Sequence, residues 1–290
     1  MILPRRVRTR VALAAACRLG SAFAGPCSGL LTPPVFVLGF NNSGKSTFVR
    51  RLALHSSLEV YPNEGNGTLW FPGFFPWVSS GQSIPPIWHD PEGFVEAALT
   101  SRKDPDFTSA RAHLAVFQLI SGRQRLLVDS GMAAAIASHL ATAFPESKFL
   151  HVVRDGRIAA YVTAQLEWSR MLRAPARYQA VGCSLDFDSV LHRMARYWAW
   201  TVGSMDTLAR QRPEAVLQVG YERWCRDPVP CEMEVREFVG EGPHHGVLPP
   251  PDTVSMRQMS NFILEQITPS QAEVIDHALG DVLQAKGYPR

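Results

Sequence analysis

Short apolar runs alternate with longer amphipathic stretches over most of this chain. Four runs have the length and apolar continuity of strands buried on both faces, and they cover residues 35–38, 126–129, 149–153 and 216–219. The stretches that follow them predict helices over 132–144, over 157–170 and in the tract after Tyr221. This alternation predicts an α/β fold with a doubly wound parallel sheet flanked by helices, whose ligand binds at the carboxyl ends of the strands.

Three further segments complete the pattern. Residues 186–211 predict one long helix, and residues 267–287, with Thr268 and Pro269 at the start, predict a closing helix. Residues 60–90 carry many Trp and Phe residues among prolines and glycines, without helical or strand period. We interpret this segment as an aromatic-rich loop that covers the ligand site. The alternative is that its aromatic side chains fill the edge of the core.

The first apolar run ends in a glycine-bounded loop. Residues 34–51 read PVFVLGFNNSGKSTFVRR, in which Gly39 to Ser46 fit the pattern G-x-x-x-x-G-K-[ST] and Thr47 continues into a helix. In such a phosphate-binding loop (P-loop), backbone N–H groups face an oxyanion, the helix N-terminus adds positive potential, and Lys45 supplies a cation. The loop therefore predicts a site for a nucleotide or another phosphorylated ligand.

Length and composition favour one main domain. With 290 residues, 46% of them hydrophobic, the chain suits a single α/β domain, which we place at residues 33–290. Residues 1–32 are rich in arginine and contain no acidic side chain, which is typical of a basic arm or a targeting segment. We expect the protein in the cytoplasm, or in an organelle if this segment is a transit sequence.

Charge and cysteine usage argue against several other classes. A net charge of +3 is small for this length, so no nucleic-acid partner is expected. The apolar run near the N-terminus is too short to cross a bilayer, and no integral membrane span is expected. The five cysteines lack zinc or haem spacing, and no metal site is predicted from them.

Taken alone, the P-loop allows a second interpretation. Residues 126–129 form an apolar strand that ends in Asp129, and P-loop kinases and ATPases hold Mg²⁺ at such a position. One alternative is therefore an Mg-dependent kinase or ATPase, and another is a nucleotide-binding module without turnover. The chain has no Asn-Lys-x-Asp motif for guanine, which argues against a regulatory GTPase.

Three later segments point to a different reaction. Residues 144–164 (FPESKFLHVVRDGRIAAYVTA), 219–228 (VGYERWCRDP) and 257–289, taken in order with the P-loop, resemble the P-loop sulfotransferases that use 3′-phosphoadenosine 5′-phosphosulfate (PAPS). The resemblance runs from about residue 34 to the C-terminus. It implies transfer of a sulfuryl group from PAPS to a hydroxyl or amine of a small, partly apolar acceptor. The product would be 3′-phosphoadenosine 5′-phosphate (PAP).

The resemblance also implies how the donor is bound. The 5′-phosphosulfate is expected at the P-loop residues Asn42, Ser43, Gly44, Lys45, Ser46 and Thr47. Arg154 is expected to hold the 3′-phosphate, a group that ATP lacks, because a guanidinium offers a planar fork to phosphate oxygens. Tyr221 is expected near the adenine.

Transfer also requires charge stabilisation and a base. Lys45 is expected to stabilise the charge that develops on the donor oxygens. The resemblance implies that Glu64, shortly after the first helix, removes the acceptor proton, and Asp129 is the second candidate for this role.

Three positions depart from the family pattern. Members commonly carry Lys or Arg immediately before Ser-Gly, where this chain has Asn42. Eight residues after Arg154 stands Val162 instead of Ser, so the missing hydroxyl is expected from Thr163. After the second strand, relatives often place Lys where this chain has Ser130. These substitutions would alter donor affinity or remove activity.

Overall fold

The computed structural model describes residues 29–54, 57–62, 69–71, 86–101, 107–122, 125–242 and 253–288. The basic segment at residues 1–28 lies outside these ranges, so the proposed boundary at residue 32 stays a prediction. Residues 63–68 and 72–85, which include Glu64 and most of the aromatic-rich loop, also lie outside them.

In the described residues, five parallel strands form one sheet in the order β2-β3-β1-β4-β5. The bounds are β1 Val35–Leu38, β2 Glu59–Val60, β3 Leu126–Ser130, β4 Lys148–Val153 and β5 Val216–Gly220. The four predicted strands are confirmed to within one residue at each end. β1 pairs with both β3 and β4, so the loop after β1 emerges between the ends of those two strands.

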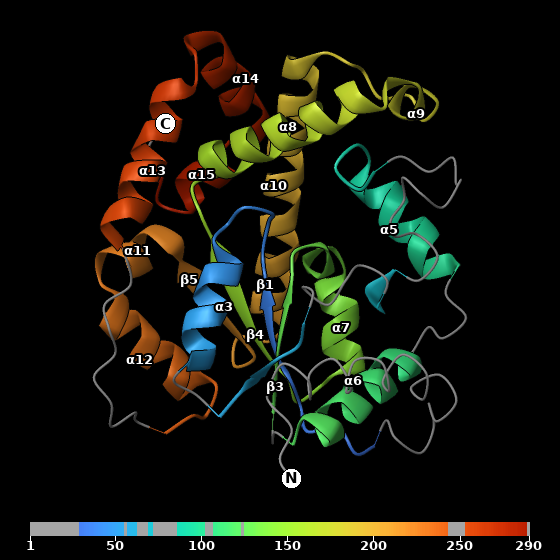
Figure 1. Ribbon diagram of the computed structural model, residues 1–290, viewed down its shortest axis with the longest axis vertical. Coiled ribbons are helices and arrows are strands. Elements are labelled where there is room, and N and C mark those ends of the chain that lie inside the picture. Colours follow the sequence, from blue (N-terminus) through green and yellow to red (C-terminus); the bar gives the residue numbers. More distant parts are fainter. Residues whose placement is uncertain are drawn as a thin grey trace.

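Helices cover both faces of this sheet (Figure 1). Those that follow the strands are α3 Lys45–Leu54, the 3-10 helix η2 Met132–Ile136, α7 Ala137–Ala143, α8 Gly156–Arg173, α11 Tyr221–Arg226 and α12 Pro228–Phe238. The others are α5 Pro91–Thr100, α6 Thr108–Ser121, α9 Pro175–Gln179, α10 Phe187–Gln211, α13 Thr253–Gln266, α14 Pro269–Leu279 and α15 Val282–Ala285.

The two faces of β1 belong to two separate hydrophobic clusters. Val35 and Val37 pack with side chains of α3, α11 and α12, whereas Phe36 and Leu38 pack with side chains of α6, α7 and α10. Successive strand residues point to opposite faces, and all four of these side chains are fully buried. Burial on both faces explains why the run is continuously apolar.

Two helix predictions need correction. The stretch 132–144 starts as the 3-10 helix η2 and becomes α-helical only at Ala137. The stretch 267–287 holds two helices, because the chain turns at Gly280 (φ +53°) between α14 and α15. The predicted start is confirmed, since Thr268 and Gln271 form a capping box. The long helix predicted at 186–211 is confirmed as α10, capped by Asp186.

The described part of the aromatic-rich segment favours the alternative in which its aromatic side chains fill the core. Trp70 and Phe71 are fully buried, and Trp88 is 6% exposed. Trp70 packs edge-on against Phe36 of β1 at 5.8 Å between ring centroids. These three side chains belong to the core, while a covering role for residues 72–85 stays a prediction.

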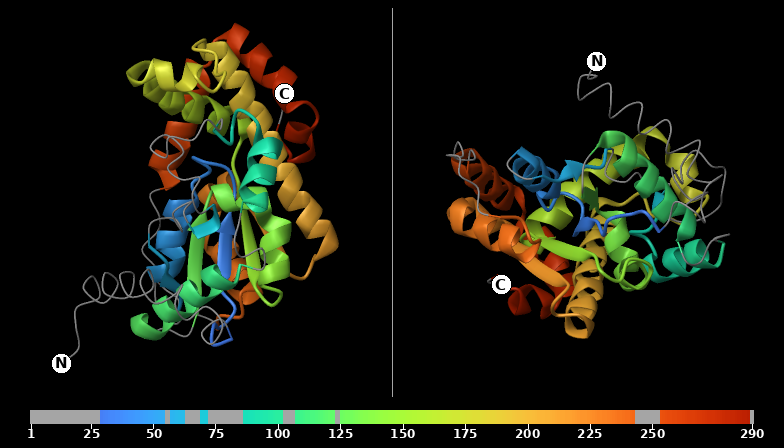
Figure 2. Two further views of the ribbon diagram at one scale, coloured as in Figure 1. Left: turned by 90° about the vertical axis from the view of Figure 1, so that its right-hand side faces the viewer. Right: turned by 90° about the horizontal axis from the view of Figure 1, so that it is seen from below.

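Above the carboxyl ends of the strands lie α8, α9 and α14, as Figure 1 and the left view of Figure 2 show. The P-loop reaches this end of the sheet between β1 and α3. The end of the sheet predicted to bind the ligand therefore has α8 standing over it.

Candidate functional site

The P-loop is shaped by three residues with positive φ, the first of which is Gly39 at φ +148°. Asn42 has φ +59° and Gly44 has φ +85°, and Lys45 then begins α3. A Cβ atom at Gly44 would lie 2.2 Å from Cε2 of Tyr221, so only glycine fits both the backbone angle and the close ring. Lys45 is 5% exposed, and its Nζ donates to the Phe40 carbonyl at 2.9 Å.

Asn42 joins the P-loop to α8 and to Arg154. Its Nδ2 donates to Thr163 Oγ1 at 2.9 Å, and its carbonyl accepts from Arg154 Nη1 at 3.0 Å. Thr163 Oγ1 in turn donates to the Ala159 carbonyl at 2.6 Å. Asn42, which stands where the family commonly has Lys or Arg, is thus hydrogen-bonded to Thr163, whose hydroxyl is expected to replace the serine missing at Val162.

Arg154 lies at the end of β4, 8% exposed and held from three sides. Besides Asn42, its Nη2 donates to Ser260 Oγ at 2.9 Å, and its guanidinium carbon lies 4.8 Å from the ring centroid of Tyr221. Burial raises the pKa of Tyr221 to about 12, so this ring stays neutral. Sequence reasoning missed Ser260, because one serine on an amphipathic helix carries no signal of its own.

Among the described residues, buried polar atoms without a hydrogen-bond partner occur in the P-loop and on Arg154. They are Ser43 Oγ in the P-loop and Arg154 Nε. Buried donors are normally paired, and orphaned ones need an explanation. An anion bound across the P-loop and Arg154 would supply acceptors for both, so the residues fit a ligand with phosphate groups.

Asp129 contacts the P-loop directly. Its Oδ2 accepts from Ser46 Oγ at 2.9 Å, and the side chain is 3% exposed. The contact brings together the serine and the aspartate that the Mg-dependent alternative requires. In the described residues, no group of three or more His, Cys, Asp or Glu side chains could hold a metal ion.

A cavity of about 690 Å³ runs along these residues. Its lining comes from the P-loop (Asn41, Asn42, Gly44, Lys45, Ser46, Thr47), the segment after β3 (Ser130, Gly131, Met132), Arg154, α8 (Val162, Thr163, Leu166, Glu167, Arg170), Tyr221, and α13 (Met259, Ile263). Glu167 is 9% exposed and forms an ion pair with Arg170. Burial raises the pKa of Glu167, while Arg170 opposes the shift.

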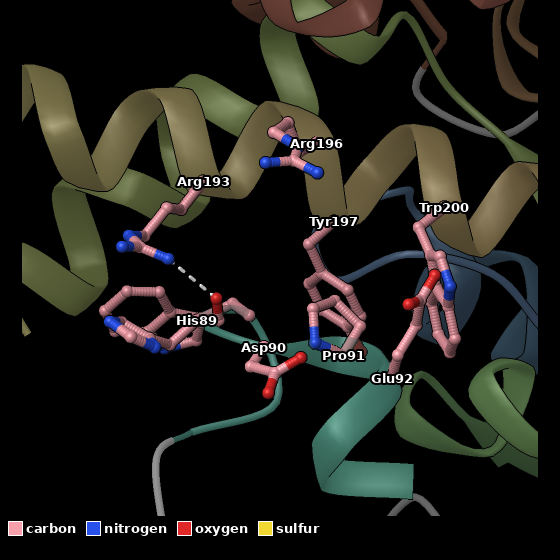
Figure 3. Close-up of a pocket in the computed structure, with 9 residues that line it drawn as sticks. His89, Asp90, Pro91, Glu92, Arg193, Arg196, Tyr197 and Trp200 are labelled. Atoms are coloured by element: carbon pink, nitrogen blue, oxygen red, sulfur yellow. Dashed lines mark hydrogen bonds between the residues drawn. The ribbon is translucent and has the colours of Figure 1, made fainter. Parts of the chain in front are cut away.

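A second cavity, of about 380 Å³, lies between the start of α5 and α10 (Figure 3). Trp88, Tyr197 and Trp200 give it aromatic walls. Arg193 donates to the carbonyl of His89 at 2.8 Å, the bond drawn dashed in Figure 3. Tyr197 also packs edge-on against Phe40, at 5.2 Å between centroids, and the Phe40 carbonyl is the one that holds Lys45. One aromatic ring thus connects this cavity to the P-loop.

The described residues bring most of the predicted site together. Asn42, Gly44, Lys45, Ser46, Thr47, Arg154, Thr163 and Tyr221 line one cavity, Ser43 lies in the same loop, and Asp129 contacts Ser46. Glu64 lies outside the described residues. Glu167 and Arg170, which sequence reasoning missed, share the cavity because two turns of α8 pass over the P-loop.

Fold and site together define an α/β protein with a P-loop and a buried arginine, Arg154, at the carboxyl end of a parallel sheet. The model of the sulfotransferase family matches residues 33–241, so this chain belongs to the sulfotransferase family and is a transferase. Among curated proteins no relative is found.

Solved sulfotransferases share the fold. STF9 from Mycobacterium avium superposes with a TM-score of 0.59 at 14% identity, over 96% of this chain and 83% of that one. STF1 from Mycobacterium tuberculosis H37Rv gives a TM-score of 0.52 at 13% identity, over 93% and 83%. In the described residues, no helix is long and apolar enough to cross a membrane.

Proposed function

We propose that this protein transfers the sulfuryl group of PAPS to a hydroxyl or amine of a small, partly apolar acceptor, and that residues 33–290 carry this activity. The observation that carries the proposal is the position of Arg154. Its Nη1 lies 3.0 Å from the carbonyl of Asn42 in the P-loop, and its Nε is buried without a described partner. A nucleotide phosphorylated at both 5′ and 3′ positions needs two such neighbouring anion sites.

The P-loop would bind the 5′-phosphosulfate. Backbone N–H groups between Asn42 and Thr47 and the start of α3 supply hydrogen bonds and positive potential to an anion. Ser43 Oγ and Lys45 add a hydroxyl and a cation. Tyr221, stacked under Arg154, offers a flat apolar surface to the adenine.

Transfer would proceed by in-line displacement at sulfur. The acceptor oxygen or nitrogen forms the new bond to sulfur as the bond between sulfur and the bridging oxygen breaks, and PAP leaves. Lys45 would neutralise the charge that grows on that bridging oxygen. Glu64 is proposed to take the acceptor proton, with Asp129 as the second candidate. Glutamate and aspartate can do so only as carboxylates.

The second cavity supports a partly apolar acceptor. Its walls include Trp88, Tyr197 and Trp200, and it is only one ring away from Phe40 in the P-loop. Aromatic side chains bury large apolar areas at little entropic cost, which suits a ring or an alkyl chain. We therefore propose that the body of the acceptor lies toward α10 and its nucleophile toward Lys45.

One observation favours a second candidate function. The contact between Ser46 Oγ and Asp129 Oδ2 matches the pair that holds Mg²⁺ in P-loop kinases and ATPases. A nucleotide-binding module without catalytic activity would keep the same P-loop. Transfer of labelled sulfate from PAPS distinguishes the sulfotransferase from both alternatives, and release of labelled phosphate from ATP with Mg²⁺ distinguishes the kinase or ATPase from the non-catalytic module.

The test measures transfer of radiolabelled sulfate from PAPS to a panel of phenols, alcohols and amines. Arg154→Ala should raise the KM for PAPS by about a hundredfold, because the partner of a buried phosphate is lost. Arg173→Ala is the matched control, since Arg173 is exposed at the far end of α8 and, within the described ranges, donates to the carbonyl of Ser169 alone. An unchanged KM in Arg154→Ala would refute the donor assignment.

A further inference from the structure

The last described residues of the chain are anchored at several points. After α15, Lys286 Nζ donates to Asp206 on α10 and, at 2.6 Å, to Gln218 on β5. Gly287, with φ +80°, donates its N–H to the Gln284 carbonyl at 2.8 Å. This turn directs Tyr288 back toward the carboxyl end of the sheet.

Tyr288 reaches the strand end that carries Arg154. Its hydroxyl donates to Glu222 Oε2 at 2.6 Å and lies 3.5 Å from the carbonyl oxygen of Val153. Burial, together with the Glu222 carboxylate, raises the pKa of Tyr288. The phenol therefore stays protonated and acts as the donor to Glu222.

Glu222 extends this connection to both sides of Arg154. Its Oε1 accepts from the backbone N–H of Asp155 at 3.0 Å, so Glu222 holds the residue that follows Arg154. Glu222 also follows Tyr221, whose ring lies under the guanidinium. A single carboxylate, oriented by the Tyr288 hydroxyl, thus connects the peptide that carries Arg154 with the ring on which Arg154 stacks.

We propose that Tyr288 is a positioning residue for the second anion site: through Glu222 it fixes Arg154 in the orientation that selects ligands carrying a 3′-phosphate. This inference rests on the proposed function, in which Arg154 binds that phosphate. A hydrogen bond to an ionised group is stronger and more directional than one between neutral groups, so Glu222 has one preferred orientation while Tyr288 is present. Without the hydroxyl, the carboxylate can rotate and the turn after β4 can relax.

The test is the discrimination between two probes, PAP and adenosine 5′-monophosphate (AMP), which differ only in the 3′-phosphate. Calorimetric titration of the full chain gives the discrimination ratio, which is the dissociation constant of AMP divided by that of PAP. Tyr288→Phe keeps the ring and removes only the hydroxyl. We expect this variant to lower the ratio about five- to tenfold, through weaker PAP binding and nearly unchanged AMP binding.

Tyr161→Phe is the matched control. Tyr161 lies on α8, is 7% exposed and donates to the Gln266 carbonyl at 3.3 Å, whereas the hydrogen bonds of the Glu222 carboxylate among the described residues are with Asp155 and Tyr288. Tyr161→Phe also removes one tyrosine hydroxyl that donates a hydrogen bond, and it should leave the ratio unchanged. In an Arg154→Ala background, Tyr288→Phe should have no further effect, because the residue it positions is absent.

The outcomes separate the inference from the proposed function. If the wild-type protein binds PAP and AMP equally, the proposed function fails. If the wild-type protein discriminates and Tyr288→Phe discriminates equally well, the positioning role is refuted while the proposed function stands. An equal fall in Tyr161→Phe would also overturn it, because the effect would then be one of general stability. Should Tyr288→Phe fail to fold, Glu222→Ala breaks the same connection from its other end, and an unchanged ratio there refutes the inference.

Discussion

Gly44→Ala tests the geometry on which the donor site depends. The added Cβ would lie 2.2 Å from Cε2 and 2.3 Å from Cδ2 of Tyr221, both far inside van der Waals contact. The ring cannot move aside freely, because it is 6% exposed, lies under the Arg154 guanidinium and packs against Trp224. The substitution should therefore displace the P-loop or the platform of the second anion site.

The size of the effect follows from two contributions. Alanine at φ +85° costs about 1–2 kcal/mol, as left-handed backbone does for residues other than glycine. Overpacking against the ring adds about 1–3 kcal/mol. The free energy of unfolding should then fall by about 2–5 kcal/mol, which leaves an ordinary domain folded. A displacement of the P-loop by about 1 Å should lower the transfer rate about a hundredfold.

Gly122→Ala is the control that separates the cost of the left-handed backbone from the cost of the steric clash with Tyr221. Gly122 ends α6 with φ +71°, and a Cβ there meets nothing within 4 Å. Urea unfolding of both variants should show the smaller loss for Gly122→Ala, with wild-type transfer of labelled sulfate. Equal losses of stability in the two variants, together with full activity in Gly44→Ala, would refute the close contact between Gly44 and Tyr221.

The remaining predictions concern the reaction and the pH dependence of stability. Lys45→Ala should lower single-turnover transfer about a hundredfold or more, because it removes the cation at the bridging oxygen; a rate near wild type would assign that role to another residue. Glu64→Gln should lower turnover with PAPS affinity nearly unchanged, whereas full turnover would favour Asp129 as the base. His151 is 2% exposed on β4, and burial, with Lys286 and Lys45 nearby, lowers its pKa to about 3. Because the unfolded chain protonates this group near pH 6.5 and the folded one does not, its contribution to stability is present above about pH 6.5 and is lost as the pH falls, at up to about 1.4 kcal/mol per unit. The free energy of unfolding, measured with urea between pH 7 and 4.5, should therefore fall less steeply with falling pH in His151→Gln than in wild type. Equal pH dependence in the two proteins would contradict the burial of a neutral imidazole.

Much of the sheet could be predicted because its strands are buried on both faces. The resulting apolar runs are visible without any knowledge of neighbours, and the P-loop follows one of them directly. β2 was missed because it has two residues, one of them the buried Glu59. α6 was missed because eight of its fourteen residues are buried, so its sequence shows no narrow apolar stripe.

The site could be predicted only where one segment carries it. Asn42 to Thr47 are contiguous, and Arg154 follows a recognisable strand. Ser260 and Glu167 contribute through helices that reach the cavity by tertiary packing, and neither has a motif of its own. Val162 and Thr163 show the limit of spacing arguments, because adjacent helix positions differ by about 100° in direction. Both line the cavity, yet it is the Thr163 hydroxyl that meets Asn42.

The measurement that tests the central claim most directly is thermal unfolding with nucleotide present. PAP in EDTA, at 100 times its dissociation constant, should add about 2.7 kcal/mol of stability through its two anion sites, and ATP with Mg²⁺ should add less at equal concentration. Stabilisation by ATP with Mg²⁺ alone, with no response to PAP, would contradict the account and favour the Ser46 and Asp129 pair as a magnesium site.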